Sequence, residues 1–138
     1  MLANVKPEDV LFIDIETAPS ARSYEDLDPS IRLLWDKKSR QFRTDEQLPG
    51  DVYGRAGIFA EFGRIICISA GFISEKNPYA FRIKSFYGDD EKEILNGFSE
   101  LVRKFSRNRE MLLCAHNGKE FDFPFLARRI LINGLPLP

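Results

Sequence analysis

The sequence predicts an α/β domain in which a mixed β-sheet is flanked by helices. Short apolar runs at residues 10–17, 64–73 and 111–115 are typical of strands, and residues 79–87 alternate as a strand that pairs with the second run. Two later segments repeat apolar residues at helical spacing. The order is therefore strand, insert, strand, strand, helix, strand, helix. This order predicts three antiparallel strands and a fourth strand that lies beside the first and parallel to it.

The first strand, Val10 to Thr17, carries two acids in an otherwise apolar run. Its Ile and Phe content predicts a central strand that is covered on both faces. Because side chains alternate along a strand, Asp14 and Glu16 are expected on one side, about 7 Å apart. Burying such carboxylates is costly unless their charge is compensated, and hard cations such as Mg²⁺ or Mn²⁺ take oxygen ligands. The run therefore indicates a metal site; the alternative is that both acids meet solvent or cap the next turn.

Residues 18–63 are predicted to form a helical insert between the first two strands. Asp28 and Pro29 fit the N-cap and the first position of a helix that runs to about residue 42. Residues 52–60 again repeat apolar residues at helical spacing, and Gly63 suits the end of that second helix.

Two further helices are predicted after the hairpin. The first follows the turn at residues 88–90, and its core stripe comprises Ile94, Leu95, Phe98, Leu101, Val102 and Phe105. Its basic face, Arg103, Lys104 and Arg107, is interpreted as solvated, with phosphate binding as the alternative. The last helix is expected from about residue 121 to Ile132.

Composition places all 138 residues in one globular domain. The net charge of −1 excludes a protein that binds polyanions by charge alone, but not an enzyme that meets phosphates through bound metal.

Cys67 and Cys114 lie in apolar runs, which predicts buried reduced thiols instead of a disulfide. Residues 1–9 lack a signal-peptide core and no stretch reaches membrane-spanning length, so we expect a cytoplasmic protein without a membrane partner.

A second acidic position follows the fourth strand. If strands one and four are adjacent and parallel, their C-terminal ends lie together, and sites form there in open α/β sheets. Asp122, near the first turn of the last helix, would then face Asp14 and Glu16. The alternative is that Asp122 only caps the helix. Phe121 beside it is either a core residue or a wall on which a base stacks.

The two acidic segments resemble a known family. Phe-Ile-Asp-Ile-Glu-Thr at residues 12–17 resembles the first motif of the DEDD family of 3′–5′ exonucleases. Asn117, followed after three residues by Phe121 and Asp122, resembles the second motif. Residues 55–69 further look like the bacterial branch related to the exonuclease domain of family B DNA polymerases. The resemblance covers nearly the whole chain.

This resemblance implies a ribonuclease H-like fold and metal-dependent hydrolysis at the 3′ end of nucleic acid, most readily single-stranded DNA. It implies that Asp14, Glu16 and Asp122 are catalytic and hold two divalent ions, Mg²⁺ or Mn²⁺. The positions implied to contact the substrate are Ile15, Thr17, Asn117, Phe121 and Phe125. For Phe125, a place in the core is the alternative.

The family's third motif, a Tyr or His four residues before a fourth carboxylate, has no counterpart in the 138 residues. We expect a C-terminally truncated fragment that is weak or inactive, with an exposed fourth-strand edge open to self-association. His116 precedes Asn117 and is not assigned the missing role. Two alternative functions stay open: an inactive nucleic-acid-binding module of the same fold, and a ribonuclease H-like endonuclease.

Overall fold

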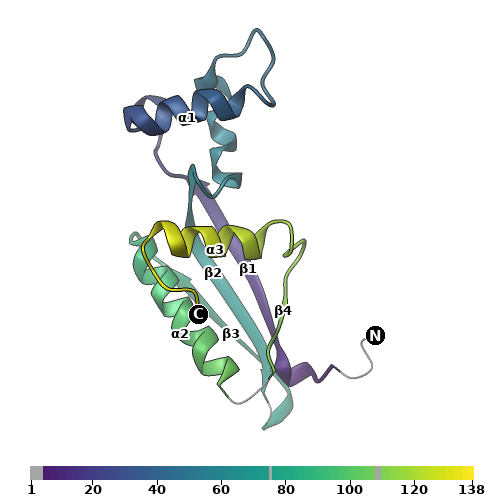
Figure 1. Cartoon of the computed structure of the whole chain (residues 1–138). Helices are drawn as coiled ribbons and strands as arrows, with labels where there is room; N and C mark the ends of the chain where they lie inside the picture. The colour runs from purple at the N-terminus through teal and green to yellow at the C-terminus, as the bar shows by residue number, and fades with distance from the viewer. Residues whose placement is uncertain (1–4, 75, 108–109) are drawn as a thin grey trace. The chain divides into compact units, whose positions relative to one another are not determined.

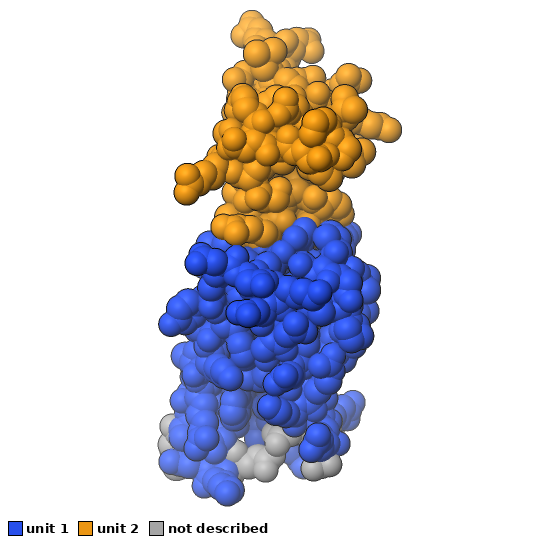
Figure 2. Space-filling view, turned by 90° about the vertical axis from the view of Figure 1, so that its left-hand side faces the viewer, with its two compact units in different colours: residues 1–16, 65–138 blue, residues 17–64 orange. Residues whose placement is uncertain are grey.

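The computed structural model describes residues 5–74, 76–107 and 110–138. The chain divides into two compact units, shown in different colours in Figure 2. Unit 1 comprises residues 1–16 and 65–138, and unit 2 comprises residues 17–64. Unit 2 differs by one residue at each end from the insert expected at residues 18–63.

Unit 1 is built on a four-stranded mixed sheet in the order β3-β2-β1-β4, as the sequence predicted. The strands are β1 (Val10–Pro19), β2 (Gly63–Ser74), β3 (Asn77–Tyr87) and β4 (Leu112–Cys114). β2 and β3 form the antiparallel hairpin, and β4 runs parallel to β1 with Cys114 opposite Phe12. Within the described part of the sheet, β4 is an edge strand, and its three residues are exposed.

β1 is buried on one face only, which corrects the expected burial on both faces. Leu11, Ile13 and Ile15 are at most 7% exposed, whereas the three residues that alternate with them are exposed. The reason is visible in Figure 1: both helices of unit 1 lie on the same side of the sheet. A short apolar run has the same composition whether one or both of its faces are covered, so the sequence could not show this.

Two helices cover the buried face of the sheet: α2 (Glu91–Ser106) and α3 (Asp122–Ile132). The Asp90 side chain caps α2 by accepting a hydrogen bond from the Lys92 backbone nitrogen at 2.7 Å. α2 buries the centre of the predicted stripe, and α3 adds a second set of apolar residues to the same core. The buried residues of the two helices are Ile94, Leu95, Phe98, Ser99, Val102, Asp122, Phe125, Leu126 and Ile130.

A buried ion pair ties α2 to α3. The Glu91 carboxylate accepts hydrogen bonds from Nε of Arg129 at 2.8 Å, from the Asn133 side chain at 3.1 Å and from the Ile65 backbone nitrogen at 2.8 Å. Burial alone raises the pKa of Glu91, but these hydrogen bonds and the charge of Arg129 outweigh it, so the pKa lies below its ordinary value. Glu91 is therefore ionised at neutral pH and holds the C-terminal half of α3.

The other face of the sheet carries an aromatic pair. The rings of Phe12 on β1 and Phe81 on β3 meet edge to face with centroids 5.8 Å apart. Gly71 on the intervening strand makes this contact possible, because a Cβ there would lie 2.5 Å from the tip of the Phe81 ring. Phe81 nevertheless stays 52% exposed, since no described helix covers this face.

Unit 2 has its own aromatic core. α1 (Pro29–Ser39) begins as predicted, with the Asp28 side chain accepting a hydrogen bond from the Ser30 backbone nitrogen at 2.9 Å. Trp35 of α1 is fully buried, and its indole nitrogen donates to the Pro49 carbonyl at 2.9 Å. The rings that pack edge-on against Trp35 are those of Phe42, Tyr53, Phe59 and Phe62.

Two predicted helices of the insert were partly wrong. α1 ends at Ser39 and not near residue 42, because the next residues turn so that Phe42 reaches the Trp35 cluster. The segment predicted as a helix over residues 52–60 is a 3-10 helix, Pro49–Ile58. Gly54 and Gly57 inside that segment lower its α-helical propensity.

The predicted burial of both thiols was also partly wrong. Cys67 and Cys114 are free, but Cys67 is half-buried and Cys114 is exposed on the edge strand. Among the described residues, no helix combines the length and the apolar character that crossing a membrane requires.

Candidate functional site

The first part of the candidate site is the exposed side of β1. Asp14 and Glu16 alternate with the buried Ile13 and Ile15, so both carboxylates lie on the face that α2 and α3 leave uncovered. The prediction that the two acids share one face is therefore confirmed. Their exposure also means that solvent reaches both carboxylates, which removes the desolvation cost that had suggested a compensating charge.

The second part is Asp122 at the start of α3. Asp122 is 4% exposed, and it occupies the first helical position instead of the N-cap. The N-cap is Phe121, whose side chain makes no capping hydrogen bond. Asp122 is therefore not the N-cap of α3, although an acid in the first turn also interacts favourably with the helix dipole.

The environment of Asp122 raises the pKa of its carboxyl group. Burial is the largest cause, and the negative charge of Asp14 acts in the same direction. Hydrogen bonds from the backbone of Asp122 itself and of Ile15, together with the nearby His116, act in the opposite direction and are outweighed. Asp14 and His116 thus each lie close enough to Asp122 to act on its carboxyl group electrostatically.

The loop between β4 and α3 brings Asp122 to this position. Cys114 pairs with Phe12, so β1 continues past the end of β4 toward Asp14. Asn117 then turns the chain with φ of +54°, a left-handed conformation that Asn tolerates better than most residues, and its carbonyl accepts hydrogen bonds from the Glu120 and Phe121 nitrogens. The turn is so compact that a Cβ on the next residue, Gly118, would lie only 2.7 Å from neighbouring carbons.

The five positions predicted to contact the substrate differ in how far their side chains are exposed. Phe121 is half-buried, and its ring centroid lies 5.4 Å from that of Phe125, which is only 2% exposed and belongs to the core. Ile15 directs its side chain into the core, so only its backbone is available at the site. Thr17 belongs to unit 2 and Asn117 is exposed.

Sequence reasoning left two residues of this region without an assigned role. The motif resemblance gave none to His116, but it acts electrostatically on Asp122. Gly118 had no assigned role, but it permits the close packing of the loop against Ala115 and Phe123. The Asn-Gly pair was the available signal for a tight turn, although it says nothing about what packs against the glycine.

The three acids offer oxygen ligands to a divalent cation. Carboxylate oxygens are the ligands that Mg²⁺ and Mn²⁺ prefer, so Asp14, Glu16 and Asp122 fit such an ion in kind. In the part of the chain that the structure describes, however, no three His, Cys, Asp or Glu side chains gather closely enough to hold a metal. Binding by all three acids would therefore require their side chains to converge around the ion.

Comparison with known proteins adds no assignment: no protein-family model matches the sequence, and neither does any curated protein.

Proposed function

We propose that this chain is a metal-dependent 3′–5′ exonuclease domain of the DEDD type, with a ribonuclease H-like fold, acting on single-stranded nucleic acid. The observation that carries the proposal is the electrostatic coupling of Asp14 on β1 with the buried Asp122 at the start of α3. Two like charges are costly to hold together, and such pairs are concentrated at functional sites.

The topology supports the same proposal. β1 and β4 are adjacent and parallel, and the loop that follows β4 delivers Asp122 to the part of β1 that carries Asp14. Sites in open α/β sheets form beyond the C-terminal ends of such strands. The mixed sheet with three antiparallel strands and one parallel strand is the arrangement expected from the motif resemblance.

Asp14, Glu16 and Asp122 are the residues that would hold two divalent ions, Mg²⁺ or Mn²⁺. Bound ions of this kind supply a water nucleophile at neutral pH and stabilise negative charge on the leaving oxygen. The exposure of Asp14 and Glu16 leaves one side of the site open to a nucleic-acid strand. The burial of Asp122 limits the water around the third carboxylate, which strengthens its interaction with any nearby charge.

Other residues of unit 1 have supporting roles in the proposal. Phe121 is half-buried, so part of its ring remains available for a terminal base to stack on. Phe125, 5.4 Å from it, supports that ring from the core and does not itself meet the substrate. The exposed side chain of Asn117 can donate hydrogen bonds to a phosphate or a base.

Cleavage of three substrates tests the proposal against its two alternatives. The chain is incubated with Mn²⁺ and a single strand labelled at its 5′ end, the same strand labelled at its 3′ end, and a circular single strand. We expect slow, stepwise shortening from the 3′ end, no cutting of the circle, and no cleavage in EDTA or with Asp14→Asn. The control Asp89→Asn removes an exposed acid before α2, outside the candidate site, and should leave cleavage unchanged.

Two results would overturn the exonuclease assignment. Cutting of the circular strand would favour the endonuclease. Binding of the strand without any metal-dependent cleavage, even by a longer chain that carries the third motif, would favour the inactive binding module.

A further inference from the structure

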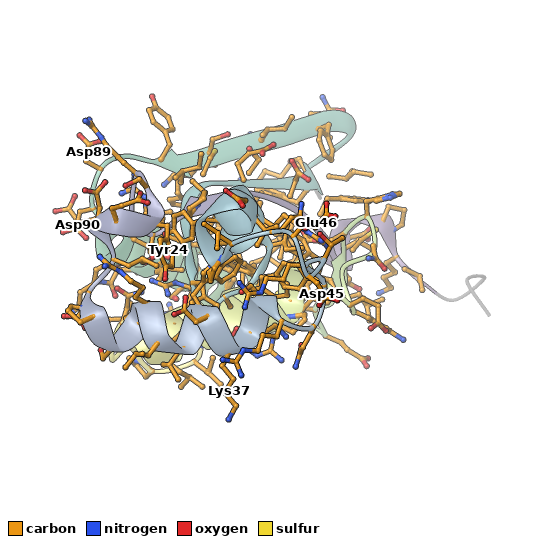
Figure 3. All side chains as sticks on the ribbon, turned by 90° about the horizontal axis from the view of Figure 1, so that it is seen from above. Tyr24, Lys37, Asp45, Glu46, Asp89 and Asp90 are labelled. Carbon is orange, nitrogen blue, oxygen red and sulfur yellow. The ribbon has the colours of Figure 1, made fainter. Side chains whose placement is uncertain are left out.

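Unit 2 carries a cluster of cations that the candidate site does not use. Five basic side chains follow one another at the end of α1, in the loop beyond it and in the 3-10 helix. We call this set the basic cluster; it comprises Lys37, Lys38, Arg40, Arg43 and Arg55. Figure 3 shows Lys37 extending away from α1 into open space.

Aromatic rings, and not carboxylates, hold two members of the basic cluster in place. The guanidinium carbon of Arg55 lies 4.4 Å from the centroid of the Phe42 ring, and Nζ of Lys38 lies 4.8 Å from that of Phe59. The two rings are themselves stacked, 5.7 Å apart and 15° from parallel. A guanidinium that rests on a ring still directs its N–H donors outward in its own plane, so Arg55 keeps its capacity to bind an anion.

The charges of the basic cluster are not neutralised within the described part of the chain. None of its five cations lies within 4.0 Å of a carboxylate oxygen there. The polar contacts of Lys38 and Arg43 go to Gln41 at 3.1 Å and to the Gln47 carbonyl at 3.3 Å, both of which are uncharged. Asp36, which precedes the cluster in the sequence, accepts a hydrogen bond from the Tyr24 hydroxyl at 2.6 Å and does not pair with a cation of the cluster.

A hollow beside the cluster is suited to an anion. It has a volume of about 470 Å³, and its lining includes Arg40, Arg43, Thr44 and Gln47. Asp45 is the one acid in the lining, and it lies with Glu46 on the exposed loop after the helix, as Figure 3 shows. Two guanidinium groups against one carboxylate leave the hollow with a net positive charge.

A purely structural explanation covers only part of the cluster. Cations in the last turn of a helix interact favourably with its dipole, and this accounts for Lys37 and Lys38. Arg43 and Arg55 lie outside α1, so the dipole does not explain why they are gathered here. A positively charged groove is the feature that follows the phosphates of a single strand, and the rings of Phe42 and Phe59 hold two of the cations in place for that contact.

We therefore infer that the basic cluster of unit 2 is a binding surface for the phosphate backbone of a single-stranded nucleic acid. The inference rests on the proposed function, because it assigns binding of the same single-stranded substrate to unit 2. That unit contains none of the three acids proposed to bind metal. The inference also resolves an apparent conflict, since a net charge of −1 for the whole chain averages over a hollow in which two guanidinium groups face one carboxylate.

Anisotropy of a fluorescent oligonucleotide of about 12 nucleotides, measured in EDTA so that the metal site plays no part, tests this surface. The variant Arg40→Gln/Arg43→Gln removes both guanidinium groups of the hollow. Each phosphate contact on a single strand contributes a salt exponent of about 0.7, so losing two contacts should weaken binding roughly 25-fold at about 0.1 M salt. The slope of log affinity against log salt should fall by about 1.4.

The control Arg103→Gln/Arg107→Gln makes the same change on the exposed face of α2 and should leave the affinity unchanged. Because Arg43 contacts the Gln47 carbonyl, its replacement can disturb the loop; Lys37→Gln/Arg40→Gln avoids that contact and should weaken binding to a similar degree. Equal losses in the cluster variants and the α2 control would overturn the inference. So would binding to vesicles that contain phosphatidylserine in the absence of any binding to the oligonucleotide.

The binding assay of the cluster variants and the cleavage assay of the wild-type chain can fail independently of each other. Loss of metal-free binding in the cluster variants, with no cleavage by the wild-type chain or by a longer chain that carries the third motif, would support the surface and contradict the exonuclease. Cleavage that depends on Asp14, with no effect of the cluster variants on metal-free binding, would support the exonuclease and contradict the binding surface.

Discussion

Burial raises the pKa of Asp122, and the negative charge of Asp14 adds to that rise although the two residues stand near opposite ends of the sequence. The parallel pairing of β1 with β4 makes this possible, because the loop after β4 places the start of α3 near the exposed acids of β1. The coupling gives the candidate site a property that can be measured before any substrate is known.

Asp14→Asn should lower the pKa of the Asp122 carboxyl group. The substitution removes the like charge that disfavours ionisation of Asp122, while burial continues to raise its pKa. Titration of the Asp122 carboxyl carbon by NMR without divalent metal would measure the change. Asp89→Asn, which removes an exposed acid before α2, should leave that pKa unchanged; equal effects of the two variants would show that Asp14 acts only through net charge.

Arg129→Ala should lower the free energy of unfolding by about 3–5 kcal/mol, since it leaves the buried Glu91 carboxylate uncompensated. Both side chains of this pair are only 11% exposed. Lys104→Ala provides the control, because Lys104 and Glu100 are 74% and 66% exposed and such a pair contributes about 0–1 kcal/mol. Urea denaturation monitored by circular dichroism would distinguish the two losses.

The same ion pair predicts a pH dependence of stability. The folded-state pKa of Glu91 lies below its unfolded value, so the folded protein holds the charged form more strongly. The resulting stabilisation is complete above the unfolded pKa and is lost as the pH falls through the folded pKa. Glu91→Gln should reduce the loss of unfolding free energy that occurs as the pH is lowered. An unchanged dependence of the unfolding free energy on pH in that variant would contradict a stabilising role of the Glu91 charge.

Gly118→Ala should destabilise unit 1 by about 1–3 kcal/mol through overpacking. The new Cβ would lie 2.7 Å from the Ala115 Cβ, which has no rotamer by which to move away, and 2.7 Å from the Phe123 ring. Gly54→Ala is the matched control: no atom lies within 4 Å of its Cβ position, so the change should be neutral or stabilising by up to about 1 kcal/mol. Thermal unfolding of both variants would test the difference.

Local patterns in the sequence were sufficient to predict most of unit 1. The alternation of residues 79–87, the stripe on α2 and the strand–helix order gave the hairpin, the helices and the β1–β4 pairing. The shared face of Asp14 and Glu16 followed from the two-residue period of a strand alone.

The features that were missed depend on contacts between distant residues. The apolar run of β1 gave no sign that one of its faces is left uncovered, and the spacing of residues 52–60 did not distinguish an α-helix from a 3-10 helix. The Glu91–Arg129 pair joins residues 38 positions apart, so no local pattern indicated it. The basic cluster was missed because total charge averages it with the acids of the same unit.

We propose that Asp14, Glu16 and Asp122 together bind a divalent cation, and the affinity of the chain for Mn²⁺ depends on all three carboxylates. The electron paramagnetic resonance signal of free Mn²⁺ would be titrated with the wild-type chain, Asp14→Asn and the control Asp45→Asn. The account predicts saturable binding by the wild type and by the control, weakened at least roughly tenfold by Asp14→Asn, because losing a ligand costs at least as much as losing a residue that orients one. Equal affinities of the wild type and Asp14→Asn, or no binding by either, would contradict it.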